Sequence, residues 1–420
     1  MNSSAISCEV LVVGGGAAGI AAAVAAARAG SRVVLLEKYG FLGGLATAAE
    51  VGTICGLYLR DTINSKPVPV CAGFPREYAS RLQQVTGREP IRVEDGLWVL
   101  PFAPPAFARV ADAIVRASDK IQLVLHVTVS GAKREGPRLA EVVALAWNQL
   151  LTVQPLSIVD CTGEATAAGL AGASTENGAA DQAPSLVFTL ENVAPDYAKN
   201  GLLETRRELR RAIDAGNLPA MCERLALVPG TGSDGRVSFK LNLVPSESNC
   251  AHWQHVTDWE RQARELVDLV QGFLIEATTA CRNARRGSVA AQIGIRSGHR
   301  IRGRATLTDA EVLGARKSPT GIARGCWPME RWGNSRRPEM TFFNEREYYD
   351  IPLDCLRPLE LDNVFVAGRC MSAAPGAMSS ARVIGTALAT GWAAGTAAAF
   401  QTQGRSLQDA VATIQRQMNE

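Results

Sequence analysis

Blocks of apolar and polar residues near the start of the chain predict a β-strand, a helix and a second strand. Val10–Val13 is a short apolar run of the kind found in buried parallel strands. A glycine cluster follows it, and an alanine-rich stretch then continues to Gly30. Alanine favours a helix, and its small side chain lets the helix pack closely on its neighbours. Arg32–Leu36 returns to the strand pattern, so the whole block is predicted to form a βαβ unit.

Similar elements follow up to residue 172. Phe107–Arg116 is amphipathic and predicts a helix, whereas Ile121–Val129 predicts a single strand. Val142–Trp147 and Leu150–Pro155 are short apolar runs separated by polar residues, which predicts a β-hairpin within a meander. Leu156–Gly172 begins as a buried strand and then turns at a glycine-containing segment.

The pattern changes between Ala173 and Arg346, and this change predicts a second structural unit. Leu186–Leu190 and Val237–Val244 have the composition of strands. Val256–Arg282 has the longest helical pattern in the chain. The apolar stripe of this helix is predicted to contain Leu266, Leu269, Val270, Phe273 and Leu274.

The glycines of the first turn have the spacing G-x-G-x-x-G, at Gly14, Gly16 and Gly19. In a βαβ unit the first glycine allows the tight turn, the second lets the backbone approach a pyrophosphate, and the third brings helix and strand together. The helix N-terminus offers unpaired N–H groups and a positive dipole end to the phosphates. Glu37 ends the second strand, where a carboxylate accepts hydrogen bonds from a ribose diol. The block is therefore predicted to bind an adenine dinucleotide, because an ordinary glycine-rich turn would not require an acid there.

The segment after this acid contains Gly43-Gly44, and here the chain resembles the glutathione-reductase-type FAD-binding fold, in which such a pair runs along the dinucleotide toward the flavin. Asp160–Glu164 resembles the second FAD landmark of these flavoproteins. Asn363–Arg369 and the small-residue stretch Ala373–Phe400 resemble their C-terminal FAD motif, with a helix that starts near Gly385 and points its positive end at the flavin. The chain is thus similar to the broad group of FAD-dependent oxidoreductases, relatives of the fumarate reductase and aspartate oxidase class.

This resemblance implies an α/β fold with a discontinuous, Rossmann-like FAD-binding domain made of a parallel sheet, a β-meander and helices. Residues 1–58, 98–172 and 347–420 are expected to form that domain, and residues 59–97 and 173–346 an inserted α+β substrate or cap domain. FAD is expected to be non-covalent, because the histidine that carries covalent FAD in the fumarate reductase class is missing after Gly44. The fingerprint and the resemblance together assign to the cofactor Gly14, Gly16, Ala17, Ala18, Gly19, Glu37, Lys38, Gly43, Gly44, Leu45, Ala46, Thr47, Val127, Thr162, Gly163, Gly368, Arg369, Arg382, Ile384 and Gly385.

Composition narrows the possible partners. The 420 residues, with 47% hydrophobic and 20% charged residues, indicate a globular chain of about two domains. A net charge of +3 gives no case for nucleic acid or an anionic membrane. Ten cysteines without a C-x-x-C pair and only four histidines predict neither a metal site nor a disulfide framework. Glycines and Arg28 interrupt the first apolar run, which argues against a membrane span. A cytoplasmic protein is expected, since the N-terminus lacks signal-peptide features, and a homo-oligomer is left open.

Gly294–Arg304 carries four arginines and one histidine, and it is the candidate for substrate chemistry. We expect Arg296 and Arg300 to hold a carboxylate or a similar anion, and His299 to act as an acid or a base. The alternative is that this basic run is a solvated surface or a dimer contact. Arg382, just before the C-terminal helix, is a second candidate for contact with the flavin or with a substrate anion.

Val51–Tyr58 is expected to lead to the reactive end of the flavin, so Cys55 is a candidate redox thiol or covalent flavin anchor; a buried small residue is the alternative. The main functional prediction is hydride transfer between a small, anionic organic substrate and flavin N5, by a dehydrogenase or oxidase of C–N or C–O bonds or a C=C reductase. A flavin-dependent monooxygenase is the first alternative, although Asp160–Glu164 does not match the Asp-Gly fingerprint of that class. A flavin-binding accessory or electron-carrier protein without its own small substrate is the second.

Overall fold

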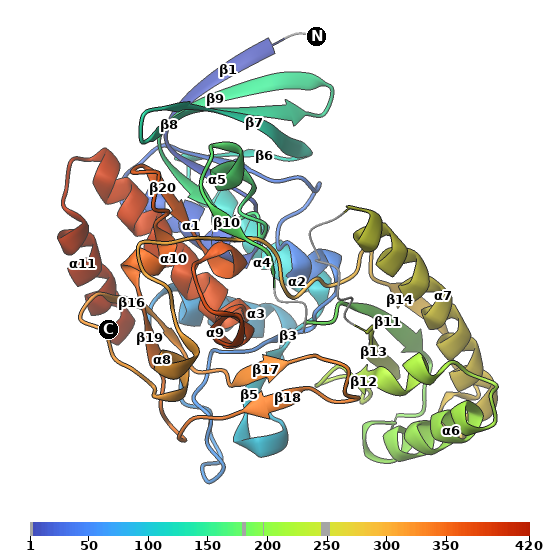
Figure 1. Cartoon of the computed structure of the whole chain (residues 1–420). Helices are drawn as coiled ribbons and strands as arrows, with labels where there is room; N and C mark the ends of the chain where they lie inside the picture. Colours follow the sequence, from blue (N-terminus) through green and yellow to red (C-terminus); the bar gives the residue numbers. More distant parts are fainter. Residues whose placement is uncertain (1–2, 179–181, 196, 245–252) are drawn as a thin grey trace.

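The protein is a mixed α/β structure, and a seven-stranded sheet lies in its upper part in the view of Figure 1. This computed structural model describes residues 3–178, 182–195, 197–244 and 253–420. The strand order is β6-β2-β1-β9-β8-β7, and β20 pairs with β9. The pairs that β1, β2, β6, β9 and β20 make with one another are parallel, whereas β7, β8 and β9 form an antiparallel meander. The strands are β1 (Ser3–Val13), β2 (Val33–Leu36), β6 (Ile121–Val124), β7 (Val127–Glu135), β8 (Arg138–Ala146), β9 (Gln149–Asp160) and β20 (Val364–Val366).

Two small-residue helices, α1 (Ala17–Arg28) and α10 (Ile384–Thr402), pack directly against each other. A Cβ atom placed on Gly391 would overlap the backbone of Ala18, and one placed on Gly395 would overlap the backbone of Ala22. The small residues of α10 therefore let its backbone contact the backbone of α1 directly. Three further helices contribute to the same hydrophobic core: α3 (Phe74–Thr86), α4 (Pro104–Arg116) and α11 (Leu407–Asn419).

The most apolar helical segment of the chain is divided at a sharp bend. Helix α9 (Pro375–Ala381) meets α10 at an angle of 93°, and only together do the two reach the length and apolarity of a membrane span. Most residues of both helices are buried against the rest of the chain. Within the described residues, no single helix is long and apolar enough to cross a membrane.

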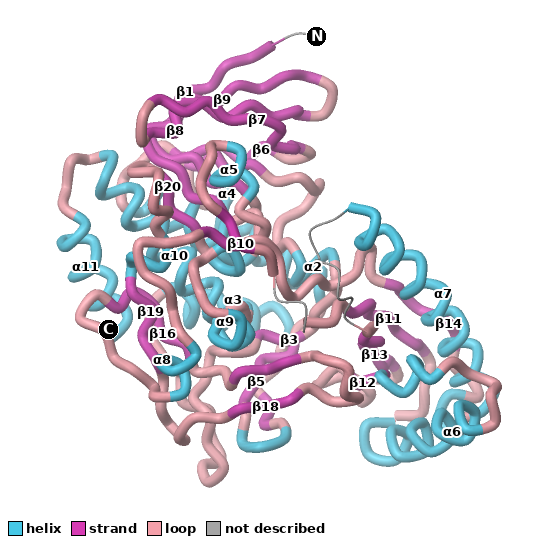
Figure 2. The backbone as a smooth tube through the Cα atoms, in the orientation of Figure 1, coloured by secondary structure: helices cyan, strands magenta, loops and turns pink. Residues whose placement is uncertain are grey.

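A second hydrophobic core lies apart from the first, in residues 186–295 (Figure 2, right-hand side). Its antiparallel sheet has the order β12-β13-β11-β14, and α7 (Trp253–Ala277) packs against it. Leu266, Val270 and Leu274 of α7 are buried, but Leu269 is 51% exposed, so the apolar stripe is narrower than predicted. The other elements are β11 (Ser185–Glu191), β12 (Leu225–Leu227), β13 (Arg236–Asn242), β14 (Arg285–Val289) and α6 (Leu202–Asp214).

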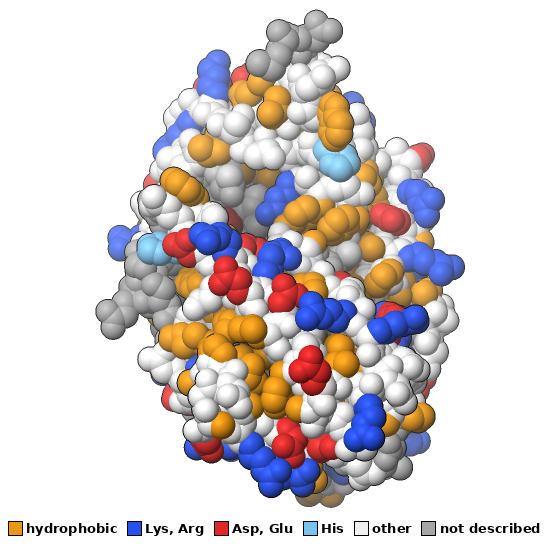
Figure 3. All heavy atoms as spheres, turned by 90° about the vertical axis from the view of Figure 1, so that its right-hand side faces the viewer, with side chains coloured by type: hydrophobic (Ala, Val, Ile, Leu, Met, Phe, Trp, Pro, Cys, Tyr) orange, Lys and Arg blue, Asp and Glu red, His pale blue; other side chains and the backbone are white. Residues whose placement is uncertain are grey.

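The surface over this second core carries charges of both signs. Figure 3 views the molecule from that side and shows Lys and Arg side chains interspersed with Asp and Glu. Helix α6 illustrates the pattern, because Arg207 pairs with Glu208 at 2.9 Å and Arg210 with Asp214 at 3.0 Å. A nucleic-acid site would instead need basic side chains clustered on one face.

Two segments predicted to lie in the cap contribute to the first core instead. Phe74 and Tyr78 of α3 are buried there, as are Ile301 and Ile322 from the later part of the chain. Residues 173–346 therefore do not form one unit, because the second core ends near residue 295. The remaining elements are α2 (Leu45–Ala48), β3 (Thr53–Ile54), β4 (Ile91–Arg92), β5 (Trp98–Pro101), α5 (Thr166–Leu170), β10 (Thr175–Glu176), β15 (Arg300–Ile301), α8 (Asp309–Leu313), β16 (Gly321–Gly325), β17 (Met329–Arg331), β18 (Glu339–Thr341) and β19 (Tyr349–Pro352).

The single strand predicted at Ile121–Val129 is two strands. His126 has a φ of 56°, and the backbone bends there between β6 and β7. The Glu37 N–H donates to the Val124 carbonyl at 2.9 Å, and the Val127 N–H donates to the Glu37 carbonyl at 3.0 Å. The bend thus places Val127 next to the acid at the end of β2.

Candidate functional site

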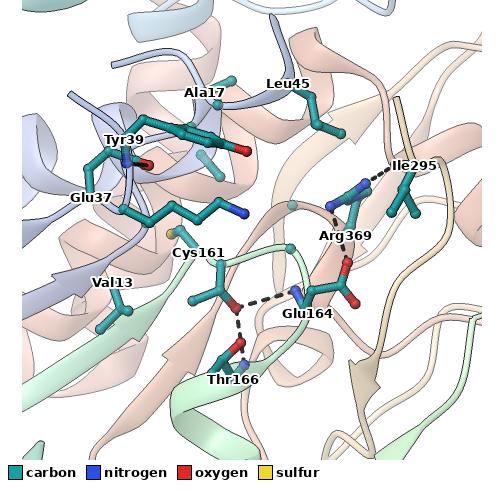
Figure 4. A pocket seen from close by; sticks show the side chains of 18 of the residues that line it. Val13, Ala17, Glu37, Tyr39, Leu45, Cys161, Glu164, Thr166, Ile295 and Arg369 are labelled. Atoms are coloured by element: carbon teal, nitrogen blue, oxygen red, sulfur yellow. Dashed lines mark hydrogen bonds and ion pairs between the residues drawn. The ribbon is translucent and has the colours of Figure 1, made fainter. Parts of the chain in front are cut away.

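A cavity of about 390 Å³ opens beyond the carboxyl ends of the parallel strands. Val13, Leu36 and Ala367, at or just after the ends of β1, β2 and β20, line it. Figure 4 shows Glu37 and Tyr39 on one side of the cavity, with Glu164 and Arg369 on the other. This edge of an open α/β sheet is where such folds bind their ligands.

Glu37 is held rigidly at one end of the cavity. Its Oε2 accepts a hydrogen bond from the Gly15 N–H at 2.5 Å, and its Oε1 accepts one from the Tyr39 N–H at 2.8 Å. The residue is only 3% exposed. Burial raises the pKa of Glu37, and the two N–H donors oppose that shift. Two backbone N–H groups therefore hold this carboxyl group at the edge of the cavity, as expected of an acid that binds a ribose diol.

The N-terminus of α1 faces the cavity through a cradle made of glycine. Gly16 is the N-cap of α1 and has no side chain to satisfy the first N–H groups of the helix. The Gly43 N–H donates to the Gly15 carbonyl at 2.8 Å, so the Gly43-Gly44 segment lies alongside the turn. A Cβ atom on Gly16 would have the Gly44 Cα, at 3.8 Å, as its nearest neighbour. The space beside Gly16 is thus open to a ligand, as pyrophosphate binding requires.

The other end of the cavity is formed by Arg369 and by the start of α10. The Arg369 guanidinium donates to the Ile295 carbonyl and lies 3.6 Å from a carboxylate oxygen of Glu164. Ile384, the first residue of α10, lines the cavity, and the N-cap of this helix is the apolar Val383. The first residues of both α1 and α10 therefore border the cavity, where a helix N-terminus favours negative charge.

A family comparison agrees with this geometry. Residues 9–418 match the family described as "FAD dependent oxidoreductase". The chain belongs to this family. The chain is accordingly an FAD-dependent enzyme. The glycine cradle, buried acid and helix N-termini of the cavity fit that cofactor, so we call it the FAD cavity. A comparison with curated protein sequences found no significant match.

Three solved structures resemble this oxidoreductase at low sequence identity. A geranylgeranyl bacteriochlorophyll reductase-like protein from Thermoplasma acidophilum has 12% identity, 98% of this chain and 83% of that chain covered, and a TM-score of 0.50. A flavin-dependent brominase has 11% identity, the same coverage and a TM-score of 0.50. A p-nitrophenol 4-monooxygenase from Pseudomonas putida has 12% identity, 98% of this chain and 81% of that chain covered, and a TM-score of 0.46. The first two likenesses show the fold alone. The family match covers FAD-dependent oxidoreductases in general and does not single out the fumarate reductase and aspartate oxidase class that the sequence resembled.

Most of the residues assigned to the cofactor from the sequence line the FAD cavity. The exceptions are Gly19, Thr47 and Gly385, which support its walls. A Cβ on Gly19 would overlap the Gly14 carbonyl, the Thr47 hydroxyl donates to the Leu42 carbonyl at 3.0 Å, and the Gly385 N–H donates to the Cys55 carbonyl at 2.9 Å. The lining residues are Gly14, Gly16, Ala17, Ala18, Glu37, Lys38, Gly43, Gly44, Leu45, Ala46, Val127, Thr162, Gly163, Gly368, Arg369, Arg382 and Ile384.

Sequence reasoning missed the residues that reach the FAD cavity from the region of the second core. Gln292, Ile293 and Ile295 line it and follow β14 directly. The Gln292 side chain also accepts a hydrogen bond from the Tyr39 hydroxyl. No motif marks these positions, because their role depends on how the second core packs against the first.

The structure separates three residues of the arginine-rich string Gly294–Arg304 that were expected to act together. Arg296 contacts Asn242 at 2.8 Å, in the region of the second core. Arg300 is buried on β15 and pairs with Glu176 at 3.2 Å, so its guanidinium already has an anionic partner. His299 faces Glu164, with 3.4 Å between Nδ1 and Oε2; Glu164 lines the FAD cavity, whereas His299 lies behind it.

The His299–Glu164 pair is expected to make stability depend on pH. The hydrogen bond to Glu164 raises the pKa of His299; burial alone would raise that of Glu164, but His299 and Arg369 lower it. His299 contributes to stability while it is protonated, and this contribution is lost as the pH rises through its raised pKa. Glu164 contributes while it is ionised, and this contribution is lost as the pH falls through its lowered pKa. Both contributions are therefore complete between pH 4.5 and pH 6.5. Because both side chains are partly exposed, His299→Gln should cost less than about 1 kcal/mol near pH 5.5 and a smaller amount near pH 8.5. Urea unfolding at both pH values measures this, and an equal cost at both would contradict it.

Cys55 is expected to be a neutral thiol at physiological pH. It is partly buried beside Glu330, and burial with the nearby carboxylate raises its pKa to about 12. Iodoacetamide should therefore label Cys55 slowly at neutral pH and faster as the pH rises, as peptide mass spectrometry can follow. Cys55→Ser should keep FAD and change turnover by less than about threefold. Rapid labelling at neutral pH, or loss of colour in the variant, would instead support a redox thiol or a covalent anchor.

Proposed function

We propose that this FAD-dependent enzyme oxidises a small organic anion that binds beyond the flavin end of the cavity. The observation that carries the proposal is the position of Arg382, a cation that is 12% exposed and lines the cavity just before α10. Burial and the charge of Arg296 lower the pKa of the neighbouring Lys240, and burial and the charge of Arg382 lower that of Arg296. Cations at this position favour a negatively charged substrate next to the reactive end of the cofactor.

Other parts of the chain contribute to this reaction in three ways. The start of α10 directs the positive end of its dipole at the flavin position, which stabilises negative charge by roughly 0.3–2 kcal/mol. Glu37 and Val127 orient the adenosine end. The segment after β14, from Gln292 to Ile295, covers the cavity and serves as part of a cap that excludes water.

Bound FAD supplies two-electron redox chemistry, which serves both oxygen-dependent hydroxylation and hydride removal. The fold does not choose between these reactions. We put the monooxygenase reaction first, in keeping with the names of the solved structures compared above. Hydride transfer between a substrate carbon and flavin N5, the main prediction from the sequence, is the second candidate.

One experiment separates these reactions. The holoenzyme is mixed without oxygen with a panel of organic acids, amino acids and hydroxy acids, first alone and then with NADH or NADPH. Bleaching of the flavin by a substrate alone indicates hydride transfer. NAD(P)H oxidation that a substrate accelerates, followed by a hydroxylated product when oxygen is added, indicates a monooxygenase. Bleaching by none of the acids, with or without NAD(P)H, would contradict the proposal and support the electron-carrier alternative.

FAD is proposed to be held without a covalent bond. Acid precipitation of the holoenzyme is expected to leave all the yellow colour in the supernatant. Colour that remains in the pellet would contradict this expectation and direct attention to Cys55, whose backbone carbonyl accepts a hydrogen bond from the start of α10.

A further inference from the structure

Four charged side chains from four separate segments meet between the two hydrophobic cores, and we call them the basic cluster: Lys240, Arg296, Glu330 and Arg382. Lys240 comes from β13, Glu330 from β17, and Arg382 from the turn between α9 and α10. Arg382 Nη2 lies 3.7 Å from Glu330 Oε2. The cluster adjoins the flavin end of the FAD cavity, because Arg382 belongs to both.

Trp332 organises the cluster. Lys240 Nζ and Arg296 Cζ each lie 4.5 Å from the centroid of its ring, which is the geometry of cation–π contacts. The Trp332 indole N–H donates to Glu330 Oε1 at 2.9 Å, and the Trp327 indole N–H donates to Glu330 Oε2 at 3.1 Å. The single carboxylate of the cluster thus has both oxygens occupied, while two cations rest on one aromatic ring.

The charges of the cluster do not balance. Three cations face one carboxylate, which leaves a net charge of +2. Arg296 is 9% exposed, and its hydrogen bonds go to uncharged acceptors, the Ala183 carbonyl, the Ser185 hydroxyl and the Asn242 amide. Buried charge without a counter-ion is costly, so this arrangement favours an anion from outside the chain.

Donors for such an anion are present. Arg382 Nε is buried and, among the described residues, has no hydrogen-bond partner. Lys240 Nζ makes no hydrogen bond or ion pair within the described part of the chain, so its N–H donors are available. Both side chains can therefore bind an oxyanion without giving up an existing hydrogen bond of these atoms.

We propose that the basic cluster binds the anionic group of the substrate and that Lys240 exchanges a proton with the substrate. This inference rests on the proposed function and gives it a site. The net charge of the cluster predicts that a dianion binds more tightly than a monoanion of the same size. In the exchange, one proton moves between Lys240 Nζ and one substrate oxygen or nitrogen atom, and no electrons are transferred.

The surroundings of Lys240 suit proton exchange near neutral pH. Burial and the charge of Arg296 lower its pKa to about 8, while Glu330 and Cys55 oppose the shift and Arg382 adds to it. His299, the acid or base expected from the sequence, is instead engaged with Glu164. Lys240 therefore replaces His299 as the proposed proton-transfer group.

Binding of three probes of similar shape to the holoenzyme tests the anion site, with the flavin absorbance spectrum as the readout. Phthalate, benzoate and benzamide carry two, one and no negative charges, and affinity should fall in that order. Arg296→Met and Arg382→Met should each weaken phthalate binding about 10- to 100-fold. Arg296→Lys and Arg382→Lys, which keep the charge, should retain the preference for phthalate. Arg302→Met, on the same string but 63% exposed, is the matched control and should bind like the wild type.

The pH dependence of phthalate binding tests Lys240. Wild-type affinity should fall as pH rises through about 8, and Lys240→Met should abolish that step while keeping FAD. Lys240→Arg should move the step beyond the measured range, and Lys133→Met, at an exposed lysine, should leave it unchanged. Equal affinity for phthalate and benzamide, or the same pH step in Lys240→Met, would overturn the inference. Selective phthalate binding without any turnover would leave the site standing and refute only the proposed function.

Discussion

Gly16→Val should abolish most FAD binding while leaving the protein folded. In the extended conformation of Gly16 (φ −73°, ψ −174°) any side chain is allowed. Its Cβ would contact only Gly44, at 3.8 Å, so the added methyl groups would project into the FAD cavity where the pyrophosphate approaches the start of α1. We expect the dissociation constant for FAD to rise at least about 100-fold, with Gly16→Ala giving a smaller rise. Titration of the apoprotein with FAD, followed by flavin fluorescence, measures both.

Two control variants separate this effect from a folding defect. A Cβ on Gly333 meets no atom within 4 Å, so Gly333→Ala should keep wild-type FAD affinity and stability. A Cβ on Gly19 would overlap the Gly14 carbonyl, so Gly19→Ala should destabilise the apoprotein itself. Melting temperatures must be compared without FAD, because bound cofactor raises them by mass action. Wild-type affinity in Gly16→Val would show that the dinucleotide binds elsewhere.

The parts of the FAD site that lie close together in sequence could be predicted from it. The turn Gly14–Gly19 and the acid Glu37 belong to one βαβ unit, whose geometry fixes where each residue lies, and the pair Gly43-Gly44 follows directly after it. The C-terminal helix could also be predicted from the sequence, because close helix packing explains its run of alanine and glycine. Local pattern and tertiary position agree in these segments.

The substrate side could not be predicted in the same way. Lys240, Glu330 and Arg382 come from strands and turns far apart in sequence, and only the packing of the second core on the first brings them together. Closeness in sequence also led to a wrong expectation. Arg296 and Arg300 lie four positions apart, but they contact different partners. The string is irregular before β15, so neither a helical nor a strand period describes it.

Gly391→Ala and Gly395→Ala should each destabilise the protein by about 1–3 kcal/mol, although alanine favours a helix. The new Cβ atoms would overlap the backbones of Ala18 and Ala22, which cannot rotate away as a flexible side chain would. Helices α1 and α10 would have to separate, and the N-termini of both border the FAD cavity. FAD affinity should therefore fall together with stability, in contrast to Gly16→Val. Urea unfolding of the apoproteins and FAD titration provide the two measurements.

Gly272→Ala is the matched control for these helix substitutions. Gly272 lies within α7, and its added Cβ would lie 3.4 Å from the mobile end of the Arg286 side chain, which can move aside. There the helix preference of alanine is the main remaining effect, so stability should rise by about 0.5–1 kcal/mol. Opposite signs at Gly391 and Gly272 would show that the α1–α10 contact, rather than helix propensity, decides the outcome. Stabilisation at all three positions would mean that the two helices are not in close contact and that the FAD cavity between their ends is not formed as described.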